Sequence, residues 1–357
     1  MEFSHICRVS KNIKTITFLN KQFFQFKMNE LSMLIEKAEK IYRKKFSNRT
    51  WFERALFFSW SCSIRDCTFC YMSTQQRNND YKKAVRSKES LYAETILCKK
   101  LGWKIGFFSG GINSYPHKEL LEILKIINSI IGEKIWLNIG PIPKKQLENY
   151  QPYIKGIIGS IETVNEKIHS EVCPSKPIKP YLKMFKNSRE LGLKNGMTLI
   201  LGLGESKVDF KKLESFIKKN NIEKIHVYAL NPVKETVFER KKSPTKEYQA
   251  WYIAKIRTSF PKIDIQMGIW KDKINRVSLL LRAGANSISK FPITKKFGSE
   301  KAKNIELEAK KAKRKFSGTL TKLPNIDWNK EIEKLTINNE TKQIVKKKLE
   351  QYLKKMS

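Results

Sequence analysis

Short apolar runs alternate with amphipathic stretches along most of the chain, and this alternation predicts its fold. Eight apolar runs have the length and composition of buried strands, and they lie at residues 55–60, 104–111, 134–139, 156–162, 197–205, 225–230, 263–267 and 285–289. Stretches with helical periodicity lie between them, for example at residues 89–101, 118–131, 181–191 and 247–259. Regular alternation of strand and helix indicates a parallel sheet, and eight such units predict an α/β fold, a closed (β/α)8 barrel of the TIM type.

An open, doubly wound sheet is the alternative arrangement for the same alternation. Its first strand–helix turn would carry a Gly-x-Gly-x-x-Gly sequence, because glycines there let the backbone approach a phosphate. The chain has no such sequence after its first strand. We therefore expect the closed barrel.

The two ends of the chain differ in pattern from the middle, which suggests three regions. Residues 1–27 are expected to form a poorly ordered extension, because a clean amphipathic pattern begins only at about residue 28 and continues through residues 30–46. Residues 28–298 then contain the barrel, with this N-terminal helix covering one of its ends. Residues 299–357 are charged and rich in lysine, and they predict a basic C-terminal helical extension: a covering helix at 300–314 and an exposed basic segment at 331–356.

The sequence indicates a cytoplasmic protein. It has no run of 18 apolar residues that could span a membrane, and no apolar core bounded by a cleavage site near its N-terminus. Its 6 cysteines are too few for a disulfide scaffold in 357 residues. Because three of them are clustered, as metal ligands are, they indicate a reducing compartment.

The clustered cysteines follow the first predicted strand directly. Cys62, Cys67 and Cys70 are spaced C-x4-C-x2-C, on a loop at the carboxyl end of that strand. Soft thiolates on one loop suit zinc or an iron–sulfur cluster. Structural zinc takes four protein ligands, commonly as two separated pairs, and no second pair is present. Three ligands leave one metal position open, which is what a reactive cluster needs.

This loop resembles the cluster loop of radical S-adenosylmethionine enzymes. The resemblance implies that the three cysteines hold three irons of a 4Fe-4S cluster and that the fourth iron binds S-adenosylmethionine. It also implies formation of a 5′-deoxyadenosyl radical that abstracts hydrogen from an unactivated C–H bond. The usual spacing in the superfamily is C-x3-C-x2-C, so one extra residue lies between Cys62 and Cys67. Phe69 matches the aromatic residue that usually precedes the last cysteine, and we expect it at the cofactor.

Further motifs resemble the biotin-synthase-like branch of this superfamily, over residues 50–300. The Ala-Gly-Ala-Asn-Ser sequence at residues 283–287 is similar to one near the last strand of biotin synthase. The resemblance implies that S-adenosylmethionine is bound by residues at the ends of the second to fifth strands. The expected binding residues are Ser109, Gly110, Gly111, Asn138, Glu162, Arg189, Gly202, Gly204 and Glu205.

Each of these residues has an expected role. Gly110 and Gly111 would let the backbone approach the amino group of the cofactor, although Ile112 replaces the usual acid. Glu162 would accept hydrogen bonds from ribose hydroxyls. Arg189 would pair with the cofactor carboxylate, whose geometry a guanidinium matches. The Gly-Leu-Gly-Glu sequence at residues 202–205 would line the adenosine.

The chain departs from biotin synthase at the second, two-iron cluster of that enzyme. No cysteine stands near Phe108, Asn138 or Gly196, and Ile269 occupies the arginine position, so this second cluster cannot form. Of the other cysteines, Cys98 fits a helix core. Cys173 follows the fourth strand and is a candidate catalytic thiol or auxiliary ligand, with a plain loop residue as the alternative.

Two relatives within the branch compete as models for the reaction. One is the archaeal two-component lipoyl synthase, which inserts sulfur into an octanoyl group carried by a protein. The other is the radical enzyme of iron-guanylylpyridinol cofactor assembly. The resemblance implies an electron donor such as ferredoxin or flavodoxin, a small-molecule or carrier-bound acyl substrate, and, for the first model, a second radical subunit. The loops that begin at Asn231 and Trp270 are candidate substrate contacts.

The charge of the chain introduces a rival from another class. With 71 Lys+Arg against 34 Asp+Glu, the net charge is +37, which attracts polyanions and acidic proteins. A non-catalytic cluster protein or a nucleic-acid-binding protein would use this charge. No zinc-finger or RNA-binding signature accompanies it, so nucleic acid is not an expected partner. Compositional drift toward Lys, Asn and Ile explains the charge equally well.

Overall fold

The strands close into a barrel in the computed structural model, which describes residues 29–74 and 84–357. The strands are β1 (Arg49–Phe57), β2 (Lys104–Ser109), β3 (Ile135–Asn138), β4 (Ile154–Glu162), β5 (Lys194–Leu201), β6 (Ile222–Ala229), β7 (Asp264–Gly268) and β8 (Ser287–Ser289). They pair in parallel in sequence order, and β1 pairs with both β2 and β8, which closes the sheet. The predicted (β/α)8 barrel is therefore confirmed, and the open sheet is excluded.

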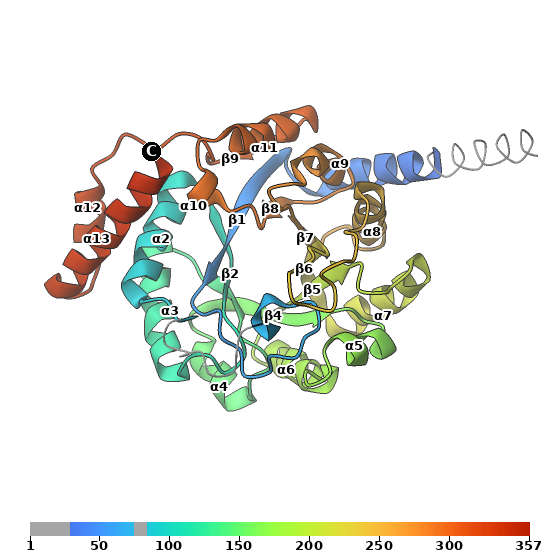
Figure 1. Cartoon of the computed structure of the whole chain (residues 1–357), viewed down its shortest axis with the longest axis horizontal. Helices are drawn as coiled ribbons and strands as arrows, with labels where there is room; N and C mark the ends of the chain where they lie inside the picture. Colours follow the sequence, from blue (N-terminus) through green and yellow to red (C-terminus); the bar gives the residue numbers. More distant parts are fainter. Residues whose placement is uncertain (1–28, 75–83) are drawn as a thin grey trace, which may run out of the picture.

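Helices surround the barrel, as Figure 1 shows. They are α2 (Lys88–Leu101), α3 (His117–Ile131), α4 (Lys144–Tyr150), α5 (Glu166–Val172), α6 (Ile178–Glu190), α7 (Phe210–Asn220), α8 (Lys246–Ser259), α9 (Val277–Arg282) and α10 (Ile293–Lys296). The side chains of Ser87 and Thr245 accept hydrogen bonds from backbone N–H groups in the first turns of α2 and α8, which helps to begin these helices where they do. Helices α4, α5, α7, α9 and α10 were not among the predicted stretches; four of them are short, and α7 buries Phe210, Leu213 and Ile217 on a face that the sequence does show.

The first strand begins and ends earlier than predicted. Its apolar run continues past the strand because Phe58 packs on Phe108, with ring centroids 4.8 Å apart. The backbone N–H of Phe58 still donates to Ser109 O (2.8 Å), but Trp60 N–H donates to Ala84 O (3.0 Å) on the other side of the cluster loop. The apolar residues after Phe57 therefore anchor the cluster loop and do not extend the strand.

The C-terminal region is more closely integrated with the barrel than the sequence predicted. It consists of α11 (Glu300–Lys311), β9 (Lys315–Ser317), α12 (Trp328–Glu333) and α13 (Asn339–Met356). Strand β9, which was not predicted, pairs with residues 49–51 of β1. The expectation of an exposed basic segment is wrong for α13, which lies along α2 and buries Val345, Leu349 and Met356 (Figure 1). Lys347, Lys354 and Lys355 are exposed, so a lysine-rich helix still has an apolar stripe.

The N-terminal helix contributes residues 29–45 to the described part of the chain. It buries Ile35, Ala38 and Tyr42, and the guanidinium of Arg314 lies 3.4 Å from the centre of the Tyr42 ring. The expected extension at residues 1–27 lies outside the described residues. No helix in the described part of the chain is long and apolar enough to cross a membrane.

Candidate active site

A cavity of about 590 Å³ lies at the carboxyl ends of the strands, where active sites of barrels of this type are found. Its volume is in the range typical of small-molecule sites. Cys62, Cys67 and Cys70 all line it. The same wall includes Phe69, Ser109, Gly110, Gly111, Asn138 and Glu162 from the predicted cofactor residues. The fold thus brings together residues that lie up to 100 positions apart in the sequence.

The three cysteines are available as metal ligands at the cavity. All three are free thiols and half-buried there. Within residues 29–74 and 84–357, no three His, Cys, Asp or Glu side chains converge on one point as the ligands of a single metal ion would. In a 4Fe-4S cluster each thiolate would bind a different iron.

Two of the three thiols, those of Cys67 and Cys70, favour the protonated form. Burial raises the pKa of the Cys70 thiol to about 11. A hydrogen bond with Cys173, together with burial, raises the pKa of the Cys67 thiol. Metal binding requires the thiolate, so a metal bound here would displace these protons into solvent.

The glycines after β2 are required by the cluster loop itself. A Cβ on Gly111 would lie 1.7 Å from Ser61 O, and a Cβ on Gly110 would lie 2.2 Å from the Phe58 ring. The N–H of Ser63 then donates to Ile112 O (2.9 Å), which joins the two loops. These glycines let the cluster loop pack against the end of β2, and both also line the cavity, so their approach to a ligand stays a prediction.

Glu162 ends β4 with its carboxylate buried between two donors. Lys176 Nζ donates to Glu162 Oε1 (3.1 Å), and Thr198 Oγ1 donates to Oε2 (2.8 Å). Glu162 has φ of 63°, an unusual backbone conformation for a residue with a side chain, and such strain is often found at functional sites. Each carboxylate oxygen keeps a further lone pair for a ligand in the cavity.

Lys176 is a cavity residue that the sequence reasoning missed. Burial alone would lower the pKa of its ammonium, but Glu162 outweighs burial and raises this pKa well above its ordinary value. The turn before it is held by His169, whose ring nitrogens contact Ile161 O (3.0 Å) and Lys176 O (2.6 Å). The chain has 71 Lys and Arg residues, and the prolines at 174 and 177 are the only sequence feature that separates Lys176 from the other lysines.

Gly202, Gly204 and Glu205 form a self-contained turn after β5 and do not line the cavity. The Glu205 carboxylate accepts hydrogen bonds from Gly202 N (2.8 Å) and Leu203 N (2.9 Å). Both glycines have positive φ, 100° and 126°, so the turn needs them for its conformation. These three residues therefore hold the turn. They do not line the cavity in which the adenosine was expected.

The expectation that Arg189 binds the cofactor carboxylate is wrong. Arg189 is exposed in the last turn of α6, a few residues before β5 begins. A helix that precedes a barrel strand ends at the amino end of that strand, so Arg189 lies at the opposite end of the barrel from the cysteines.

Cys173, the candidate catalytic thiol or auxiliary ligand, does not line the cavity. Cys173 is 1% exposed and packs with Val172, Leu203, Leu230 and Phe238 behind Cys67, outside the cavity lining. Cys98 is fully buried in the core, as predicted. Cys7 lies outside the described residues.

The opposite wall of the cavity is formed by residues at the carboxyl end of β6 and by residues that follow β6, β7 and β8. It includes Tyr228, Asn231, Trp270 and Lys290. Asn231 and Trp270 were predicted as substrate contacts from their positions after strands. Tyr228 and Lys290 were missed, because neither belongs to a recognisable motif.

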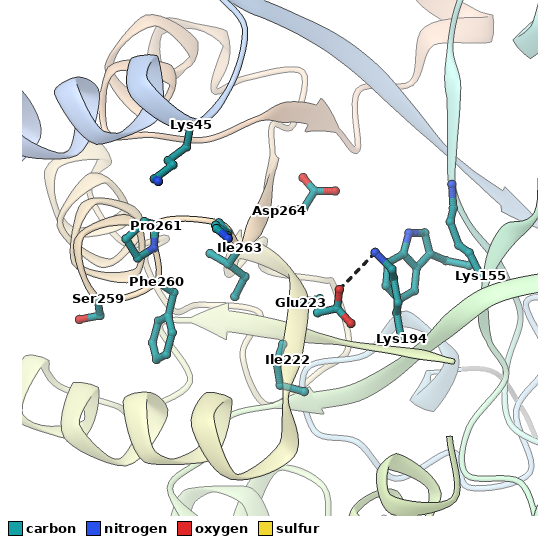
Figure 2. A pocket seen from close by; sticks show the side chains of 12 residues that line it. Lys45, Lys155, Lys194, Ile222, Glu223, Ser259, Phe260, Pro261, Ile263 and Asp264 are labelled. Atoms are coloured by element: carbon teal, nitrogen blue, oxygen red, sulfur yellow. Dashed lines mark ion pairs between the residues drawn. The ribbon is translucent and has the colours of Figure 1, made fainter. Parts of the chain in front are cut away.

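A second cavity, of about 820 Å³, opens at the amino ends of the strands and has no chemistry of this kind. Figure 2 shows lysines around it, among them Lys45 and Lys155, and the ion pair between Lys194 and Glu223 (3.2 Å). Its lining contains no cysteine or histidine. We therefore take the carboxyl-end cavity as the candidate active site.

A parallel barrel with three cysteines at its carboxyl end defines the class of radical enzymes that use an iron–sulfur cluster. In agreement, residues 61–217 match the family model described as Radical SAM superfamily. The chain belongs to this superfamily, whose cofactors are a 4Fe-4S cluster and S-adenosylmethionine.

Individual relatives support the same assignment. The uncharacterized protein MJ0597 of Methanocaldococcus jannaschii is 40% identical over 314 residues, which cover 87% of this chain and 86% of that protein. Biotin synthase of Thermodesulfovibrio yellowstonii is 28% identical over 236 residues, covering 64% and 72% of the two chains. The crystal structure of methylornithine synthase superposes with a TM-score of 0.64 at 19% identity, covering 72% of this chain and 77% of that one, and shares the fold.

Proposed function

We propose that this radical S-adenosylmethionine enzyme abstracts a hydrogen atom from an unactivated C–H bond of a small substrate held in the carboxyl-end cavity. The observation that carries the proposal is the position of Cys62, Cys67 and Cys70 on the rim of one cavity that also has a free wall after β6, β7 and β8. When bound, the cluster supplies the electron that splits S-adenosylmethionine into methionine and a 5′-deoxyadenosyl radical, which takes the hydrogen atom.

The protein's own residues position the cofactor and exclude water. Lys176 and Glu162 form a charged pair in the wall, and we assign the Lys176 ammonium to the cofactor carboxylate and the Glu162 oxygens to hydroxyl groups. Phe69 contributes apolar surface on the cluster loop. Asn138 accepts a hydrogen bond from Ser160 Oγ (3.1 Å). Exclusion of water by the bound cofactor and substrate would protect a radical from side reactions with solvent.

Two finer reactions are candidates within this class. Sulfur insertion in lipoyl synthesis needs a sulfur donor, and among the described residues neither Cys98 nor Cys173 lines the cavity. That reaction would therefore depend on sulfur from a partner, such as a second radical subunit. A step of iron-guanylylpyridinol cofactor assembly needs no sulfur donor in this chain, and the cavity supports it better. Either reaction requires an external electron donor, for which ferredoxin and flavodoxin are our candidates.

The test is anaerobic reconstitution with iron and sulfide, followed by reduction with dithionite in the presence of S-adenosylmethionine. We expect about four irons per chain and formation of 5′-deoxyadenosine and methionine. A protein that binds iron but never cleaves S-adenosylmethionine would contradict the proposal and favour the non-catalytic cluster protein. Binding of nucleic acid at physiological salt would favour the nucleic-acid alternative.

A further inference from the structure

The charges that line the active-site cavity do not balance. Its acidic lining residues are Glu53 and Glu162, and its basic ones are Arg54, Lys176 and Lys290. Lys176 pairs with Glu162, Glu53 pairs with Lys224, and Arg54 pairs with Glu94 beneath the wall. Lys290 is the one basic residue of this lining that has no carboxylate partner among the described residues. Apart from the cluster cysteines, the cavity lining thus has one positive charge without an ion-pair partner, on the wall opposite Glu162.

Lys290 is held in place by aromatic rings and by its backbone. Its Nζ lies 4.7 Å from the centre of the Tyr228 ring and 5.9 Å from that of Trp270. Its φ is 68°, so the chain adopts a costly conformation to present this side chain at the end of β8. Burial lowers the pKa of its ammonium, with Glu162 and Cys70 partly opposing this, so the charged form lacks a close counter-charge.

Two further donors lie on the same wall. The indole Nε1 of Trp270 is buried and has no hydrogen-bond acceptor in the described part of the chain. Buried indole N–H groups nearly always find a partner, so an unpaired one in a cavity indicates a missing ligand. Lys273 Nζ donates to Asn231 Oδ1 (3.4 Å), which assigns the amide oxygen and leaves the Asn231 amide nitrogen as a donor.

We propose that Lys290, Trp270 and Asn231 bind a carboxylate of the substrate, which makes the substrate a small carboxylic acid. This inference rests on the proposed function, because it assigns the substrate to the wall that the cofactor leaves free. An ammonium and two neutral N–H donors match an acceptor with one negative charge. A phosphate monoester carries more charge than this wall offers, so the carboxylate is favoured.

The inference separates the candidate reactions. An octanoyl chain attached to a carrier protein has no free carboxylate, so it would leave Lys290 and the Trp270 indole unpaired inside the site. Unpaired buried polar groups lower affinity strongly, which is how such a site rejects a substrate that lacks the matching group. A carboxylate anchored on β7 and β8 would also hold the reacting C–H bond at a constant distance from the cluster loop.

The test uses reconstituted holoenzyme with S-adenosylmethionine bound and two matched probes, butanoate and butanamide. Saturation-transfer NMR under anaerobic conditions measures the affinity of each probe, with inorganic phosphate as a third arm. We expect butanoate to bind at least about 10-fold more tightly than butanamide, the effect of one charged hydrogen bond. Equal binding of the two, no binding of butanoate, or preferred binding of phosphate would overturn the inference.

Substitutions in this wall test whether its residues cause the preference for butanoate. Lys290→Met should remove the preference for butanoate over butanamide, whereas Lys290→Arg should keep this preference within about 3-fold of the unmodified protein. Trp270→Phe should weaken the affinity for butanoate by about 3- to 10-fold. Lys271→Met is the matched control, because Lys271 is exposed beside Trp270 and lies outside the cavity lining. A loss as large in Lys271→Met would mean that general charge, not this wall, binds the probe.

Failure of this inference can be distinguished from failure of the proposed function. The affinity for S-adenosylmethionine and the cluster absorbance of Lys290→Met should equal those of the unmodified protein, which also shows that the variant folds. If S-adenosylmethionine is cleaved but carboxylates are not preferred, the function stands and the substrate class is wrong. If no cleavage occurs in any variant or in the unmodified protein, the proposed function itself fails.

Discussion

Lys224 and Lys290 are both lysines inside the barrel, but their surroundings are opposite. Lys224, on β6, donates to Glu53 Oε1 (2.9 Å) and to Asp264 Oδ2 (2.6 Å). Burial alone would lower the pKa of Lys224, but the two carboxylates outweigh it and raise this pKa. Lys290, at the end of β8, has aromatic rings beside it and makes no ion pair with a carboxylate of the described residues; burial lowers its pKa.

The difference between the two regions separates structural charge from functional charge. Around Lys224 the charged side chains are paired: Glu53 also accepts from Trp51 Nε1 (3.0 Å), and Gln266 bonds to Glu53 and to His226. Burial lowers the pKa of His226 to about 3, so this ring stays neutral at neutral pH. Paired charges stabilise one fold, whereas a charge without an ion-pair partner beside a cavity is available to a ligand.

The largest effect is expected from removal of a cluster ligand. Cys67→Ala should abolish both the cluster absorbance and the cleavage of S-adenosylmethionine, because the two remaining thiolates cannot hold the cluster. Cys98→Ala is the matched control, since Cys98 lies in the core away from the cavity, and it should keep both properties. Full activity of Cys67→Ala would refute the radical assignment. The measurements are the absorbance spectrum and the yield of 5′-deoxyadenosine.

The free energy of unfolding of two variants tests the comparison of Lys224 with Lys290. Lys224→Met leaves Glu53 buried without its counter-charge and should lower the free energy of unfolding by about 3–5 kcal/mol. Lys290→Met breaks no ion pair and should change it by less than about 1 kcal/mol. Denaturant unfolding of both variants measures the difference. Similar losses in the two variants would show that Lys290 is also structural.

The next effect concerns the pair on the cofactor side of the cavity. Lys176→Ala should weaken S-adenosylmethionine binding by about 1.5–3 kcal/mol, the value of a charged hydrogen bond. Arg189→Ala, which removes an exposed charge at the other end of the barrel, should leave the dissociation constant unchanged. Calorimetric titration of both variants checks this, and the reverse result would return Arg189 to the site.

The smallest effect is a dependence of stability on pH that comes from Glu53. Burial alone would raise the pKa of this carboxyl, but Lys224 outweighs burial and holds it at about 2, against an ordinary value of 4.5. The pairing therefore stabilises the fold fully above about pH 4.5 and is lost as the pH falls toward 2. Between pH 6 and pH 4 this group should contribute a loss of about 1 kcal/mol.

A variant isolates this contribution from those of other acids. Glu53→Gln removes the titrating group, so its unfolding free energy should decline less steeply over the same pH range, whatever its absolute stability. Parallel pH profiles for the variant and the unmodified protein would show that the pKa of Glu53 is not depressed in the fold.

Much of the fold could be predicted from the sequence, because the patterns that predict it involve residues close together in the sequence. Alternation of apolar runs with amphipathic stretches determined the barrel, and the spacing of Cys62, Cys67 and Cys70 on one loop determined the superfamily. These properties need no knowledge of distant contacts. The C-terminal region was the exception, since β9 forms only where β1 offers an edge, and α13 is buried only where α2 receives it.

The sequence alone could not identify most residues of the site, because contacts across the barrel decide which side chains reach the cavity. Lys176 and Lys290 are ordinary lysines in a lysine-rich chain until β4 places Glu162 beside one and β6 and β7 place aromatic rings beside the other. Cys173 follows a strand, as an active-site residue would, yet its side chain packs behind Cys67. The sequence by itself determined the cluster loop and the barrel that carries it, since both depend on local spacing. Which charges are neutralised and which face the cavity was decided only by the tertiary structure, because pairing depends on distances between strands that are remote in sequence.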